Sequence, residues 1–162
     1  MLPYVIVGGL LAVPVLLGFL MRVSAPHIFF SVMAGELLAR YFGEKAILEA
    51  EKAFRNPYTT HYAELAILTI PVVLTALILK GTISIGKNIL NIVPLVITGL
   101  VYASFALPLL PSDVQSTISS NPLGQELLNT SSTIIGAVVV IQLVALWVLN
   151  RGEKSKKRRK KD

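Results

Sequence analysis

Four polar side chains stand inside hydrophobic stretches of this chain, and they are the residues best suited to carry chemistry. Glu36 and Arg40 are four residues apart, so on a helix they share a face and can neutralise each other. Glu64 and Gln142 lie in two other apolar stretches. Ionisable groups at membrane depth normally face a bundle interior or a wet cavity, where they can line an ion or proton path. A second interpretation stays open, in which Arg40 reaches the lipid headgroups and Gln142 bonds a neighbouring helix.

The signatures of common enzyme classes are absent from the sequence. It contains no P-loop, no GxSxG, no HExxH and no Asp-rich cluster. It has no cysteine, which excludes disulfides, thiolate metal sites and a cysteine nucleophile. His27 and His61 could share a metal or a haem only if the fold brought them together. We therefore predict a protein that is not an enzyme, with no catalytic, cofactor or metal site.

The elements that position these residues are long hydrophobic segments. The chain is 54% hydrophobic and 15% charged, where a soluble domain carries about 25% charge. Residues 89–111 contain no charged side chain, and as a helix they would be about 35 Å long, enough to cross a hydrocarbon core of about 30 Å. The other segments are residues 4–21, 27–43, 61–79 and 132–150. We predict an all-α fold: a polytopic transmembrane helical bundle of four to five hydrophobic segments.

Three stretches between these segments carry further expectations. The first segment lacks a basic region before it, so we expect a retained anchor and not a cleaved signal peptide. Residues 27–43 either span the membrane or form a shorter re-entrant piece. Residues 44–55 have apolar positions at helical spacing, which predicts an amphipathic helix in the membrane interface. Residues 112–131 are polar and predict a loop with a short helix at 123–128.

The C-terminal tail, residues 151–162, sets the predicted orientation. It carries eight Lys and Arg residues against Glu153 and Asp162, which accounts for the whole net charge of +6. Basic residues near span ends favour the cytoplasm, so we place the tail there, with residues 80–88 inside and residues 112–131 outside. The N-terminus is then outside if 27–43 spans and inside if it is re-entrant. Contacts with anionic lipid headgroups or a partner are assigned to Lys156, Lys157, Arg158, Arg159, Lys160 and Lys161.

The order of segments resembles the colicin V production protein family, small bacterial inner-membrane proteins with about four spans. The hydrophobic pair, the polar linker and a hairpin ending in LPLLP, followed by SSNPLGQELL, carry this resemblance over residues 4–128. The family's basic and glycine-rich run at the hairpin turn is not present, so no functional residue is carried over. The resemblance implies a non-enzymatic protein of the bacterial inner membrane, tied to envelope function or export.

Two functions are consistent with these features. The first is a non-catalytic accessory or scaffold component of the membrane, acting as a homo-oligomer or a subunit of a membrane complex. The second is an oligomeric small channel or transporter whose path is lined by Glu36, Arg40, Glu64 and Gln142. No aromatic residue is interleaved with the basic residues of the tail, so a nucleic-acid partner is not predicted.

Overall fold

The computed structural model describes residues 2–53, 59–83, 89, 91–119, 125 and 135–144. Every regular element within these residues is a helix, which confirms the all-α class for the described part of the chain. The elements are α1 (Leu2–Leu20), α2 (Ala25–Ala53), α3 (Thr59–Ile78), α5 (Ile92–Ala106), the 3₁₀ helix η1 (Leu107–Leu109), α6 (Ser112–Ser119) and a C-terminal helix, Ile135–Val144.

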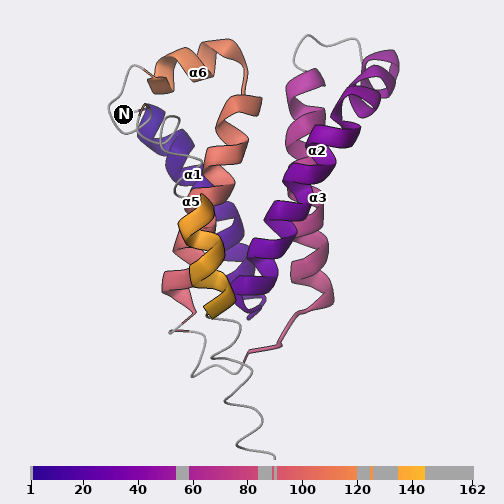
Figure 1. Ribbon diagram of the computed structural model, residues 1–162. Helices are drawn as coiled ribbons and strands as arrows, with labels where there is room; N and C mark the ends of the chain where they lie inside the picture. Colours follow the sequence, from indigo (N-terminus) through magenta and orange to yellow (C-terminus); the bar gives the residue numbers. More distant parts are fainter. Residues whose placement is uncertain are drawn as a thin grey trace, which may run out of the picture.

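The helices form two groups (Figure 1). The antiparallel helices α2 and α3 make up one group, and α1, α5 and the C-terminal helix make up the other. The groups meet where α1 is followed by α2 and α3 ends, which we call the connection end. They diverge toward the opposite end, where α6 lies across the top of the second group and the N-terminus is found, and which we call the α6 end.

The predicted boundary at residue 43 is wrong. The segment 27–43 and the amphipathic stretch 44–55 form one continuous helix, α2, as far as Ala53. Its 29 residues give a length of about 44 Å, more than a hydrocarbon core requires. The composition changes at Glu44, but α2 has no proline after its second residue, Pro26, and Gly43 costs a helix only about 1 kcal/mol relative to alanine. A change from apolar to charged side chains determines whether lipid or water is the favourable surrounding for that part of the helix. It does not interrupt the backbone hydrogen bonds.

The end of the segment 89–111 also differs from the prediction. The α-helix stops at Ala106, a single 3₁₀ turn follows, and Leu110 is extended. Pro108 lacks a backbone N–H and so cannot continue the α-helical hydrogen bonding. A new helix, α6, then begins at Ser112, where a loop was expected. The helix predicted at 123–128 lies outside the described residues except for Gln125.

Two described helices are long and apolar enough to cross a membrane, Thr59–Ile78 and Ile92–Leu109. Two further apolar helices, Tyr4–Leu20 and Ile135–Val144, are shorter than that requirement. By length and composition alone, the described chain therefore supports two spans, where four to five were expected. Helix α2 is long enough, but its charged residues set it apart from an ordinary apolar span.

Close helix contacts hold each group together. Gly35 of α2 lies against the backbone of Leu68 in α3, and a side chain there would collide with the Leu68 carbonyl oxygen. In the other group, a Cβ on Gly99 of α5 would lie 2.7 Å from the Leu11 carbonyl oxygen of α1. Small residues at such contacts let two helix backbones approach, which is a common basis of helix packing in membranes.

The connection end is fastened by backbone and amide hydrogen bonds. The Asn91 side chain accepts from the Ala25 backbone N–H at 2.9 Å and donates to the Val23 carbonyl at 2.8 Å. Gly81 N–H donates to the Met21 carbonyl, and Ile83 N–H donates to the Arg22 carbonyl. These bonds join the turn between α1 and α2 to the segments that end α3 and begin α5.

Candidate polar site

Glu36 and Arg40 lie on the same face of α2, as their spacing predicts. The Arg40 Nε donates to Glu36 Oε1 at 2.7 Å, and the side chains are 71% and 14% exposed respectively. The carboxylate is therefore largely covered, while the guanidinium is exposed to solvent.

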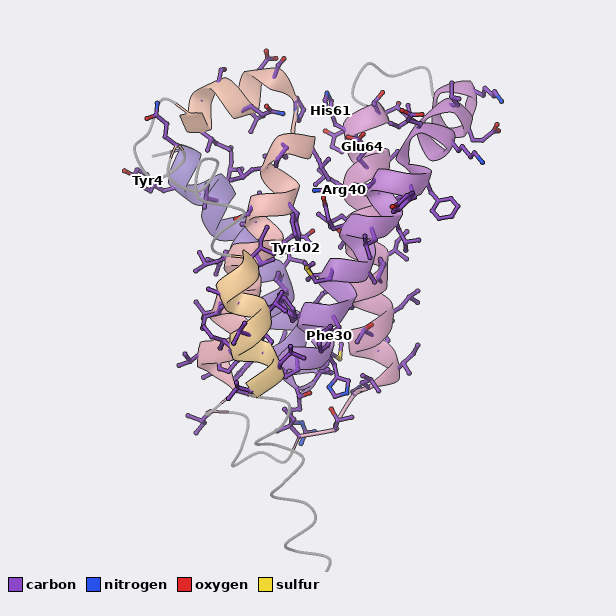
Figure 2. The ribbon with its side chains drawn as sticks, viewed as in Figure 1. Tyr4, Phe30, Arg40, His61, Glu64 and Tyr102 are labelled. Atoms are coloured by element: carbon purple, nitrogen blue, oxygen red, sulfur yellow. The ribbon has the colours of Figure 1, made fainter. Side chains whose placement is uncertain are left out.

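Glu64 lies at the same level of the bundle on α3. Gly35 of α2 packs on Leu68 of the antiparallel α3, so one helical turn toward the α6 end brings Glu64 beside residues 38–40. Glu64 is half-buried, and no ion-pair partner lies within 4.0 Å of it among the described side chains. Figure 2 shows Arg40, Glu64 and His61 gathered toward the α6 end, between α5 and the α2–α3 pair. We call Glu36, Arg40, His61 and Glu64 the polar cluster.

His61 contributes to this cluster in a way that the sequence did not reveal. Its Nδ1 lies 3.0 Å from the Leu109 carbonyl oxygen of η1. A carbonyl can only accept, so the ring nitrogen donates. The bond links the first turn of α3 to the end of the other helix group.

The other histidine, His27, lies in the first turn of α2 with its Nδ1 against the Ser24 hydroxyl. Because α2 and α3 are antiparallel and each histidine begins its helix, His27 and His61 lie at opposite ends of the bundle. They cannot share one metal or haem iron. Among the described residues, no three His, Asp or Glu side chains are grouped as metal ligands.

Two hydroxyl groups, those of Thr69 and Tyr102, extend the polar cluster toward the middle of the bundle. The Thr69 hydroxyl donates to the Leu65 carbonyl at 2.6 Å, and it lies 2.7 Å from the Tyr102 hydroxyl. Since the Thr69 proton is already used, Tyr102 is the donor in the second bond. This bond joins α3 to α5. A tyrosine and a threonine within apolar segments were the signal that could have indicated it.

The layer below this bond is formed mainly by apolar side chains. Phe29, Val32 and Val72 are fully buried there in the core shared by the two groups. Ser31 lies in this layer, between Phe29 and Val32 along α2, and Thr98 lies one turn from Tyr102 along α5; each hydroxyl donates to a carbonyl of its own helix. The polar cluster and the Thr69–Tyr102 bond therefore extend from the α6 end to Tyr102, about halfway through the bundle (Figure 2).

Gln142, the fourth polar residue singled out from the sequence, lies away from the polar cluster. It is fully buried between the C-terminal helix and the first turns of α5. Its Nε2 donates to the Pro94 carbonyl and to the Thr98 hydroxyl, each at 3.0 Å. Its Oε1 is buried without a hydrogen-bond partner. This geometry suits the attachment of one helix to another, and it separates Gln142 from the polar cluster.

The basic residues assigned to lipid or partner contact, at 156–161, lie outside the described residues. Comparisons with protein-family models, with curated proteins and with solved structures give no match for this chain. The resemblance to the colicin V production protein family therefore stays a prediction.

Proposed function

We propose that this chain is a small integral membrane protein of non-catalytic type, which acts as an accessory or scaffold component. The observation that carries the proposal is the exposure of α3, because only 17% of its apolar 18-residue window is buried. A core helix of a water-soluble protein is mostly buried, and large exposed apolar patches are rare on soluble monomers. In a bilayer, the same surface faces lipid tails and needs no other cover.

The proposal also includes α1 and the C-terminal helix, whose apolar stretches are shorter than a membrane span requires. Large apolar side chains are also exposed on α1 and on the C-terminal helix, among them Leu16, Leu20, Val140 and Val144. Both helices pack in the same layer as α5, so a membrane that holds α5 would surround them too. Continuous α2 runs from the connection end to the α6 end, which favours a crossing over a re-entrant piece. We therefore retain five embedded segments as the proposal.

The orientation follows from charge. The described part of the C-terminal helix, Ile135–Val144, runs toward the connection end, and in the sequence the basic tail, residues 151–162, comes after it. Arg22 and Lys80 also lie at that end. The proposed cytoplasmic side is therefore the connection end, and the N-terminus and α6 face outward. A bacterial inner membrane, an envelope or export role, and anionic-lipid contacts through 156–161 belong to the same proposal.

The test is the native mass of the protein in lipid nanodiscs, measured alone and after gentle extraction from its own membrane. A scaffold or accessory protein should carry defined partner chains from its own membrane, and those chains would name the process it serves. A closed homo-oligomer without partners would favour a pore over the accessory role.

The second candidate function, a small channel or transporter, rests on the polar cluster. Glu36 and Glu64 are the acids at its centre, and Tyr102 marks its inner limit. Because apolar residues lie below, transport would require a rearranged or oligomeric state. In proteoliposomes, Glu64→Gln and Glu36→Ala should each reduce ion or proton flux several-fold, while Glu49→Gln on exposed α2 should not. Equal flux in all of these variants would exclude the cluster as a path.

A further inference from the structure

The strength of the attachment between the two helix groups differs greatly between the two ends of the bundle. Within each group, the helices touch through backbone at Gly35 and Gly99, which fixes their relative position. Helix α6 is also held to its own group, since Ile118 and Leu107 pack with Ile6 and Val7 of α1. Each group is thus well placed to move as one body.

At the connection end, the attachment is made by backbone and buried side chains. Asn91, Gly81 and Ile83 bond the turn that links α1 to α2. The start of α2 adds Ile28, Phe29 and Val32 to the shared core. Buried backbone hydrogen bonds and packed apolar side chains resist separation more strongly than exposed polar contacts do.

At the α6 end, α2 contributes nothing comparable. Between residues 36 and 52, the only described residue of α2 that is buried is Gly43. Large apolar side chains stand exposed on this part of the helix, including Leu37, Tyr41 and Phe42. From this end to the middle of the bundle, attachment to the other group falls to α3, through His61 with Leu109, the packing of Leu65, and Tyr102 with Thr69.

We propose that the α2–α3 pair pivots about the connection end, and that the His61 and Tyr102 hydrogen bonds are the contacts that hold it closed. Release of these two bonds would separate α3 from η1 and α5 and open the polar cluster from the α6 side. The inference goes beyond the proposed function, because it holds for a scaffold that grips a partner as well as for a transporter. Hinge motions of this kind concentrate movement at a few fastened residues and leave packed helix pairs intact.

The chain has no cysteine, so introduced cysteines can carry spin labels at chosen sites. One labelled pair reports on the α6 end, with Tyr62→Cys on α3 and Asp113→Cys on α6. A second pair reports on the connection end, with Leu20→Cys on α1 and Ile78→Cys on α3. All four native side chains are exposed. Distances between labels are measured by electron double resonance in nanodiscs, with and without the substitutions His61→Leu and Tyr102→Phe.

We expect the two substitutions to lengthen the α6-end distance by several ångströms or to add a second, longer population, while the connection-end distance stays constant. The single variant Tyr102→Phe, which removes only a hydroxyl, should give a smaller change in the same direction. An α6-end distance that is unchanged in every variant would overturn the pivot. A simultaneous change at both ends would also overturn it, because that result indicates general loosening.

Discussion

At the scale of single residues, Asn91 connects two turns that are distant in the sequence. Its side chain bonds Ala25 and Val23, and it is buried. Asn91→Leu would leave both backbone groups unsatisfied, so we expect the free energy of unfolding to fall by about 2–4 kcal/mol. The measurement is an SDS titration in detergent micelles, followed by circular dichroism. Gln125→Ala, at an exposed position, is the control, and it should change stability by less than about 0.5 kcal/mol.

Gln142 is also buried, but we expect its replacement to cost less. Gln142→Leu removes two hydrogen bonds to Pro94 and Thr98 and also removes an acceptor that has no partner. The Pro94 carbonyl keeps the Thr98 hydroxyl as a donor. Interhelical polar contacts in membranes contribute about 0.6 kcal/mol on average, so a loss below about 1 kcal/mol is expected in the same titration. A loss as large as that of Asn91→Leu would show that the buried Oε1 has a partner, such as an ordered water.

At the scale of helices, the α2–α3 contact depends on a missing side chain. Gly35→Ala would place a methyl group against the Leu68 carbonyl, and we expect it to destabilise the protein by about 1–3 kcal/mol. Gly43→Ala on the same helix meets no atom within 4 Å, and the higher helix propensity of alanine should stabilise by up to about 1 kcal/mol. Opposite signs for the two variants in the SDS titration are the expected result. Equal effects would mean that α2 and α3 are not packed at this point.

At the scale of the whole molecule, many large apolar side chains are exposed and several polar side chains are buried. Asn91, Thr98, Ser104 and Gln142 are buried, whereas Ile78, at the end of α3, is 78% exposed. A soluble fold shows the reverse preference. The proposed bilayer satisfies this distribution because lipid replaces water around the helices.

The proposed orientation gives a prediction at the same scale. Single variants Ser112→Cys, in α6, and Thr82→Cys, at the connection end, both sit at exposed positions. In intact cells, a membrane-impermeant maleimide should label the first variant and should label the second only after the membrane is broken. The reverse pattern would place the N-terminus and α6 in the cytoplasm. Labelling of both variants in intact cells would argue against a membrane between the two ends.

The sequence by itself determined the helical class, the apolar segments and the ion pair of Glu36 with Arg40. It could do so because apolar content, charge and a spacing of four residues are local properties that survive any arrangement of helices. Local rules failed at element ends, where Glu44 did not interrupt α2 and Ser112 began a helix, since composition changes there without a fixed backbone signal. They also predicted four to five spans, whereas two of the described helices are long and apolar enough to cross a membrane.

Only the tertiary structure decided which polar groups meet. It placed His61 and Tyr102 beside the predicted acids, and it moved Gln142 to a separate helix contact. It also fastened the bundle at one end through Asn91. Each of these bonds joins residues more than 30 positions apart. Such pairings depend on how helices cross and pack, and the spacing of residues along one helix does not contain that information.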